Sequence, residues 1–214
     1  AVRQDGFFLQ TPDAKRDADQ ASSDAIFVFT RASNKIAVRG NLLEVSGLVR
    51  EVAYHSEHRE LSTTSIDADK VSLISSGNKL PQPIVLNASM LRPDRASTWL
   101  ERFENMRVSM PKMLVVAPAG GRLNDVTAAS VSDGRFYGVV FGTARPFREP
   151  GIPANERASQ KNVGNVTVFD ENPERLHVDS LGQAKAIAMS VDVGDVITGI
   201  VGVLAQANDS YSLF

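Results

Sequence analysis

The three histidines are the first side chains in this sequence that could take part in chemistry. His55 and His58 lie three residues apart in a stretch expected to form a hairpin tip, and His177 lies between Leu176 and Val178. Two imidazoles with a distant third could ligate zinc. On a hairpin tip, however, solvated side chains are the commoner arrangement, so this spacing alone does not indicate a metal centre.

The sequence lacks the motifs of nucleophilic and nucleotide-binding sites. Gly-x-Ser-x-Gly, the P-loop and the dinucleotide fingerprint are all absent. Ser76-Gly-Asn-Lys79 matches Ser-x-x-Lys in spelling, but it lies in a turn-rich stretch and not at the start of a helix. The chain has no cysteine, which excludes disulfides and thiolate metal sites. We therefore expect no active site in this chain and no enzyme activity of its own.

The polar loop from Thr11 to Asp24 is a better candidate for a metal site. It holds four aspartates, Asp13, Asp17, Asp19 and Asp24. Asp17 and Asp19 stand at alternate positions, so their oxygens could be offered to calcium. The loop has no glycine for the sharp turn of an EF-hand, and Lys15 and Arg16 would compete with the cation. Aspartates also form turns in solvated loops, so both interpretations remain open.

The charge of the chain is unevenly distributed along its 214 residues. The formal net charge of −2 argues against a strongly basic nucleic-acid binder. Residues 92–161 nevertheless hold 11 basic and 7 acidic side chains, whereas residues 162–214 hold 2 and 7. Only the middle stretch therefore offers phosphates a favourable field. The longest apolar run, Val196 to Ala205, is too short to cross a bilayer.

The stretch Ile36–Val52 is expected to form a glycine-containing strand around which the rest of the chain is organised. A turn at Gly40-Asn41 leads into a run rich in Val and Leu, which Gly47 interrupts. Glycine inside a strand marks a bulge, a bend or a close backbone approach. The pattern returns in Val191–Leu204 with one extra residue, as a bulge would allow. The corresponding glycines are Gly40 and Gly194 in the turn, and Gly47 and Gly202 in the strand. The sequence thus predicts one small all-β unit used twice.

Short strands separated by turn residues fill most of the remaining chain. They are expected at Gly6–Gln10, Ile26–Phe29, Leu61–Ile66, Val71–Ile74, Arg107–Val116, Phe136–Phe141, Val166–Phe169, Leu176–Val178 and Tyr211–Phe214. Thr98–Met106 is the one helix candidate, with Thr98 and Glu101 at capping-box spacing. We predict a mainly β fold of two tandem OB-like Greek-key barrels. The first barrel spans residues 1–91, a linker helix 92–106, and the second barrel 107–214.

Aromatic side chains at alternate positions predict a nucleic-acid-binding face on these barrels. An OB barrel stacks bases on exposed aromatics while basic residues follow the backbone. If Phe7, Leu9, Ile26 and Val28 fill the core, the opposite face of the first barrel carries Phe8, Gln10, Phe27 and Phe29. In the second barrel the corresponding set is Arg135, Tyr137 and Phe141, with Arg145 and Arg148 in the loop beyond. The alternative is that these rings pack against the linker helix or the neighbouring barrel.

Several segments also resemble parts of a known protein family. Gly6–Gln10, Asp17–Phe29 and Val38–Gly47 resemble the OB-like domain of secreted bacterial nucleases, where such domains precede a metal-dependent catalytic domain of the endonuclease/exonuclease/phosphatase class. Leu100–Met106 and Asn172–Asp179 are similar to later parts of the same region, as are Val193–Val196 and Ser210–Leu213. The resemblance implies one further strand before Ala1, which would leave the first barrel without its N-terminal strand.

The resemblance implies a function as well as a fold. We expect a secreted, non-catalytic region that binds DNA or RNA weakly and salt-sensitively, and orients it for a nuclease domain located after Phe214. The alternative is a structural or protein-interaction module that packs on the catalytic domain or on cell-surface partners, which the net charge of −2 favours. No cofactor is expected apart from calcium at the aspartate loop, and no membrane association.

Overall fold

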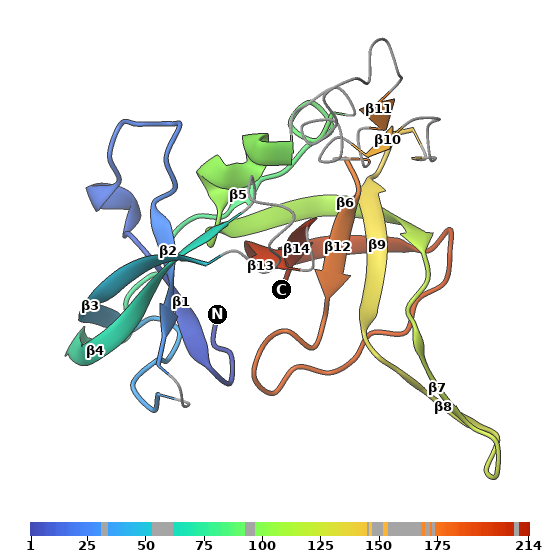
Figure 1. The fold of residues 1–214 in the computed structure, drawn as a ribbon, viewed down its shortest axis with the longest axis horizontal. Helices are drawn as coiled ribbons and strands as arrows, with labels where there is room; N and C mark the ends of the chain where they lie inside the picture. The colour runs from blue at the N-terminus through green and yellow to red at the C-terminus, as the bar shows by residue number, and fades with distance from the viewer. Residues whose placement is uncertain are drawn as a thin grey trace.

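A computed structural model of the chain describes residues 1–30, 34–52, 62–92, 97–144, 146, 152–153, 168–169, 172, 174–207 and 210–214. This part is mainly β, as the sequence predicts, and forms two units side by side (Figure 1). The strands of the first unit are β1 (Gly6–Gln10), β2 (Ala25–Phe29), β3 (Leu42–Val52) and β4 (Thr63–Ser75). Those of the second are β5 (Ile84–Val85), β6 (Arg107–Ala117), β9 (Arg135–Val140), β12 (Leu176–Asp179), β13 (Val196–Ala207) and β14 (Ser210–Leu213).

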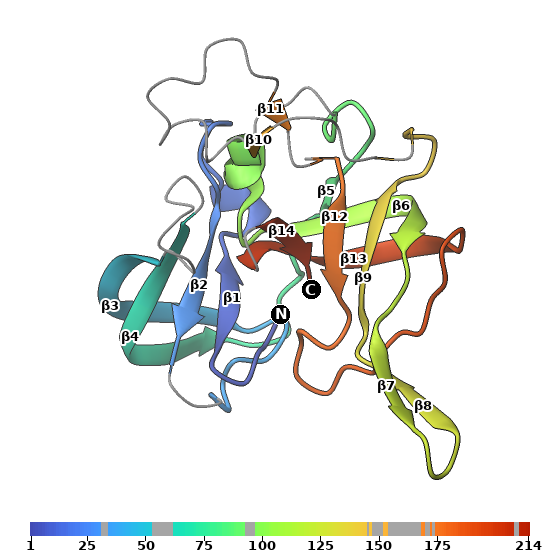
Figure 2. The ribbon, with the colours of Figure 1, turned by 45° about the vertical axis from the view of Figure 1, so that its right-hand side comes forward.

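Smaller elements connect or extend these strands. They are the 3₁₀ helices η1 (Asp13–Lys15) and η2 (Ser97–Phe103), the hairpin β7 (Gly121–Asn124) and β8 (Ala129–Ser132), and the parallel pair β10 (Ile152–Pro153) and β11 (Val168–Phe169). The β7–β8 hairpin projects away from the body of the second unit (Figure 2). The sequence predicts a loop for the segment of β7. Helices of the described residues are all too short to span a membrane.

The second unit closes on itself as a five-stranded barrel. β6 pairs antiparallel with both β9 and β13, β9 pairs with β12, and β13 pairs with β14. β12 and β14 run parallel and complete the ring. If β6, β9, β12, β13 and β14 are numbered 1 to 5 in chain order, their order around the barrel is 1-2-3-5-4, and strand 4 pairs again with strand 1. β5 adds to the β6 side as a short parallel partner.

The first unit has the same strand order with one position open. β1 pairs antiparallel with β2, β2 runs parallel to β4, and β4 pairs antiparallel with β3. These relations match the second to fifth strands of the closed barrel, in the order 2-3-5-4. Beside β1, Ala1 and Val2 run back along the open position. The Phe8 N–H donates to the Ala1 carbonyl over 2.9 Å, and Val2 forms an antiparallel bridge with Phe7.

The two glycine-marked strands occupy the same place in their sheets, since β3 and β13 are both the fourth strand in this order. Gly40 and Gly194, in the preceding turns, have φ angles of +86° and +97°, the left-handed conformation that favours glycine. The pairing of β3 with β4 shifts register between Ser46 and Gly47, so Gly47 lies at a bulge, one of the three features that a glycine inside a strand indicates. A Cβ at Gly47 would collide with the backbone carbonyl of Asp67.

Each unit has its own apolar core, and the two cores differ in size. In the barrel, Met113, Phe136 and Leu204 are at most 1% exposed and belong to one large cluster. The core of the first unit centres on Phe7 and Val28, with partly buried residues around them. The predicted inward set of Phe7, Leu9, Ile26 and Val28 is therefore confirmed. Apolar residues of β3 are exposed, among them Leu48 and Val49.

Two expected elements differ from the structure. The predicted strands Leu61–Ile66 and Val71–Ile74 are parts of one strand, β4, because β3 pairs with it along its whole length despite the polar stretch between them. The predicted helix Thr98–Met106 is the shorter 3₁₀ helix η2. It ends before Asn105, which has a left-handed φ of 62°. Leu100 of η2 is buried in the barrel core, so this segment is part of the second unit's packing as well as a connection.

Candidate nucleic-acid interface

The outer face of strands β6, β9 and β12 gathers cationic and aromatic side chains. Along β9 the side chains alternate, so Phe136 lies in the barrel core while Arg135 and Tyr137 point to the other side. β12 lies next to β9 with Tyr137 opposite His177 and Arg135 opposite Asp179. The strand register therefore places these four side chains in two neighbouring cross-strand pairs.

Tyr137 is the centre of an aromatic and cationic cluster. Its ring centroid lies 5.1 Å from that of His177, and the guanidinium carbon of Arg175 lies 4.5 Å from the Tyr137 ring centroid. Tyr137 itself is half-buried and Arg175 is exposed. A cation over an aromatic face is attracted by the ring quadrupole. The pair offers a stacking surface and a positive charge at the same place.

His177 is the buried member of this cluster and packs against the ring of Tyr137. Its side chain is 4% exposed, and its Nδ1 lies 2.9 Å from Ser212 Oγ on β14. Burial lowers the pKa of His177, so the imidazole is neutral at physiological pH. The ring therefore positions Tyr137 and adds no charge to the face.

Arg135 is exposed but paired. Its Nε lies 3.2 Å from Asp179 Oδ2, and its backbone N–H donates to Asp133 Oδ1 over 2.9 Å. An exposed ion pair of this kind contributes little to stability, about 0–1 kcal/mol. Its effect here is to hold the guanidinium beside Tyr137 while partly offsetting its charge.

Phe141 and Lys112 form a second cation–aromatic pair. The Lys112 Nζ lies 3.9 Å from the Phe141 ring centroid, and the Phe141 N–H donates to the Lys112 carbonyl. Phe141 is 46% exposed. An exposed phenyl ring beside a lysine can stack a base while the ammonium meets a phosphate.

The predicted second-barrel residues are thus brought together in part. Arg135 and Tyr137 are adjacent on β9, and Phe141 follows the end of the same strand. Arg145 and Arg148 lie outside the described residues. The sequence prediction missed Lys112 and Arg175. Arg175 could have been found because it directly precedes the predicted strand Leu176–Val178. Lys112 could have been found from the alternation of side chains along β6, but Pro111 interrupts that pattern.

The first-unit set shares one face, as predicted, but this face meets the second unit. Phe8 lies opposite Phe27 across the β1–β2 pair, with ring centroids 5.1 Å apart. Phe8 also stacks on Phe214, and the Gln10 Oε1 accepts a hydrogen bond from the Arg107 N–H. The expectation of an outward, solvent-facing set is therefore wrong for Phe27, which is 8% exposed and whose ring lies against that of Phe8 and beneath the guanidinium of Arg3. Phe29, at the end of β2, is half-buried.

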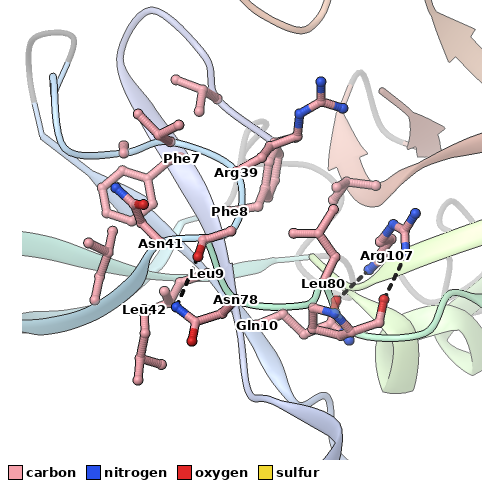
Figure 3. A pocket seen from close by; sticks show the side chains of 18 of the residues that line it. Phe7, Phe8, Leu9, Gln10, Arg39, Asn41, Leu42, Asn78, Leu80 and Arg107 are labelled. Carbon is pink, nitrogen blue, oxygen red and sulfur yellow. Dashed lines mark hydrogen bonds between the residues drawn. The ribbon is translucent and has the colours of Figure 1, made fainter. Parts of the chain in front are cut away.

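A hollow of about 170 Å³ lies at the open strand position between β1 and β3. Figure 3 shows it with Phe8 and Gln10 of β1, Asn41 before β3 and Arg107 of β6 around it. Arg107 Nη1 donates to the Pro81 carbonyl over 2.7 Å. The described residues that line the hollow include three basic side chains and no carboxylate; the basic ones are Arg39, Lys79 and Arg107. This part of the surface also offers phosphates a favourable field.

The four aspartates of the predicted calcium loop are all engaged in hydrogen bonds or an ion pair. Asp17 and Asp19 each accept a backbone N–H two residues further on, which is the turn-forming arrangement. Asp24 pairs with Arg16 at 2.7 Å, and Asp13 accepts the Gln82 N–H. Within the described ranges, no three Asp, Glu, His or Cys side chains converge as a metal site. His55 and His58 lie outside those ranges, and calcium binding stays a prediction.

Comparisons of this chain with protein-family models, with curated proteins and with solved structures find no match. The class that the structure itself defines is a mainly β protein with a closed five-stranded barrel.

Proposed function

We propose that this chain is a non-catalytic accessory region that binds single-stranded nucleic acid on the β6–β9–β12 face of its barrel. The observation that carries the proposal is the pair of cation–aromatic contacts on that face, Lys112 with Phe141 and Arg175 with Tyr137. Single-strand binders combine stacking rings with cations that follow the backbone. Both contacts supply the two components together.

The strand order supports the finer proposal that both units are OB-like. The order 1-2-3-5-4, with a parallel pair between the third and fifth strands, is compatible with a five-stranded Greek-key barrel of this type. OB barrels use the face of their second and third strands to bind oligonucleotides. In the second unit these strands are β9, which carries Arg135 and Tyr137, and β12, which carries His177 and Asp179. In the first unit the same order lacks its first strand.

Binding is expected to be weak and to depend on salt. The face presents Lys112, Arg135 and Arg175, and Asp179 partly offsets Arg135. Neutralising about three phosphates of a single strand would give a slope of log K against log salt of roughly −2. Stacking on two rings would add roughly 1–3 kcal/mol per base. Affinity should therefore fall with salt but keep a salt-independent part.

The test is fluorescence anisotropy of the chain with labelled single- and double-stranded DNA and with RNA over a salt series. Lys112→Glu and Phe141→Ala should each weaken single-strand binding by roughly tenfold. Lys70→Glu, which makes the same charge change at an exposed position of β4, is the matched control and should change affinity by less than about twofold. Absence of binding at low salt would reject the proposal.

We further propose that the region serves a secreted bacterial nuclease, with a catalytic domain of the same polypeptide after Phe214. The support is the resemblance of Gly6–Gln10 and Val38–Gly47 to such accessory domains. On this proposal the chain alone does not cleave nucleic acid. Cleavage of labelled strands that survives repeated purification, and that follows the protein through chromatography, would overturn it.

A structural or protein-interaction module is the second candidate. One observation favours it: Phe8, which could have stacked a base, instead contacts the rings of Phe27 and Phe214. On this alternative, Lys112→Glu would leave nucleic-acid binding unchanged, and the chain would bind the isolated catalytic domain of its parent protein. The same anisotropy series therefore separates the two candidates.

A further inference from the structure

A second hollow, of about 630 Å³, lies where the first unit meets η2. It is walled by the loop before β2, the ends of β3 and β4 that face η2, and η2 with the residues after it. Figures 1 and 2 both show η2, the green coil, beside this loop, near the start of β2. The carboxylates of its lining are Asp17, Asp24, Glu51, Glu101 and Glu104, and the described lining contains no lysine or arginine. The hollow lies away from the β6–β9–β12 face.

Glu104 is the buried carboxylate of this hollow. It is 6% exposed, and its Oε2 accepts the Thr64 backbone N–H over 3.3 Å. Its Oε1 is buried and has no hydrogen-bond partner among the described residues. The pKa of Glu104 is raised to about 7, mainly by burial and to a smaller extent by the charges of Glu51 and Glu101, while hydrogen bonds from Thr63 and Thr64 act in the opposite direction. A buried carboxylate oxygen without a donor is costly, so the site lacks a donor or a cation.

The neighbouring glutamates add negative charge to the hollow and so further favour a bound cation. Glu101 is exposed, and its pKa is raised by partial burial and by Glu51. Glu51 accepts hydrogen bonds from the hydroxyls of Ser62 and Thr64, which fix it at the rim. Asp24 is already neutralised by Arg16. The lining therefore has four carboxylates that no described basic side chain pairs with, those of Asp17, Glu51, Glu101 and Glu104. The described lining contains no basic side chain.

We propose that this hollow binds a small linear polyamine. A polyamine carries ammonium groups separated by methylene chains, which suits carboxylates that are spread along a groove. A single metal ion would need three or more ligands at one point, and the described residues form no such group. One ammonium meets Glu104 Oε1 at the buried end, and the others meet Glu101 and Glu51 nearer the rim. The volume is in the range of small-molecule sites.

The test is isothermal titration calorimetry with spermidine as the probe, at about pH 8 so that Glu104 is ionised and at low salt to limit screening. We expect saturable binding of one spermidine per chain. Glu104→Gln and Glu101→Gln should each weaken it by at least about tenfold. Glu101 is exposed, so its variant keeps the test informative if Glu104→Gln alters folding. Glu44→Gln, which removes the same charge from an exposed position of β3 outside the hollow, should leave affinity within about twofold.

Two results would overturn the proposal. The first is no saturable binding of spermidine at low salt. The second is equal weakening by Glu44→Gln, which would mean diffuse attraction to an acidic surface. Neither of these results bears on nucleic-acid binding at the β6–β9–β12 face, so the two proposals fail separately.

Discussion

The ring of Phe8 on β1 stacks on the ring of Phe214, the last residue of the chain, with centroids 6.3 Å apart and planes inclined by 26°. This contact joins the first unit to the second. Arg3 lies over the same place, with its guanidinium carbon 5.3 Å from the Phe214 centroid. The aromatic face of the first unit therefore holds the two units together.

Phe8→Ala should destabilise the chain without weakening nucleic-acid binding. The substitution removes ring contacts with Phe27 and Phe214, each worth about 0.5–1.5 kcal/mol beyond the buried area. Urea denaturation should show the loss, whereas anisotropy with a labelled single strand should be unchanged. Leu48→Ala is the control, since Leu48 is 57% exposed. A fall in affinity at unchanged stability would instead place Phe8 in the binding site.

Gly47→Ala should be strongly destabilising. At this bulge an added Cβ would collide with the backbone carbonyl of Asp67, which cannot move without disturbing the β3–β4 pairing. Overpacking of this kind costs about 1–3 kcal/mol or more. The neighbouring Ser46→Ala is the control, because it adds no atom. Equal unfolding midpoints for the two variants would contradict the close approach at Gly47.

Glu104 should make the stability of the chain depend on pH. The pKa of this carboxyl is raised from 4.5 to about 7 in the folded chain, so the folded state binds its proton more tightly than the unfolded state. The contribution of Glu104 to the free energy of unfolding should therefore be highest below about pH 4.5. It should fall as the pH rises toward about 7 and stay constant above that pH. A shift of this size corresponds to roughly 3 kcal/mol at most.

Glu104→Gln tests this pH dependence. The variant should lose the fall between about pH 4.5 and 7, and should be more stable than the parent at about pH 8. Urea denaturation at several pH values measures both effects, and Glu44→Gln is the control. A Glu104→Gln profile parallel to that of the parent chain would show that Glu104 titrates at its ordinary pKa.

The sequence predicts the local β features well, because they depend on neighbouring residues. Phe7, Leu9, Ile26 and Val28 alternate as strands with one buried face require, and the structure confirms them as core. Gly47 breaks a Val- and Leu-rich run, and the bulge lies at that residue. Patterns of period two and isolated glycines carry this information directly.

The candidate site could be predicted only in part, because it depends on which strands become neighbours. Tyr137 and Arg135 follow from alternation along β9, but their partners His177 and Asp179 come from β12 through pairing at long sequence separation. Phe8 stacks on Phe214, which is a contact between distant parts of the chain, and no local pattern indicates such a contact. The hairpin of β7 and β8 was missed because its strands are short and exposed.

Tyr137 should contribute to binding through its ring and not through its hydroxyl. Tyr137→Phe keeps the face that lies under Arg175 and should retain single-strand affinity within about twofold, whereas Tyr137→Ala should lose about 1–3 kcal/mol of stacking. Anisotropy of both variants measures the difference, and circular dichroism checks that the barrel is folded. Equal losses in both variants would assign the effect to the hydroxyl.

The most direct test of the proposed interface is single-strand affinity after Lys112→Glu, measured by anisotropy at low salt beside Lys70→Glu. We expect a loss of roughly tenfold and a shallower salt dependence for Lys112→Glu, because a phosphate contact is replaced by repulsion. Lys70→Glu should change the affinity very little. Equal affinities for the parent chain and both variants would contradict a nucleic-acid interface on β6, β9 and β12.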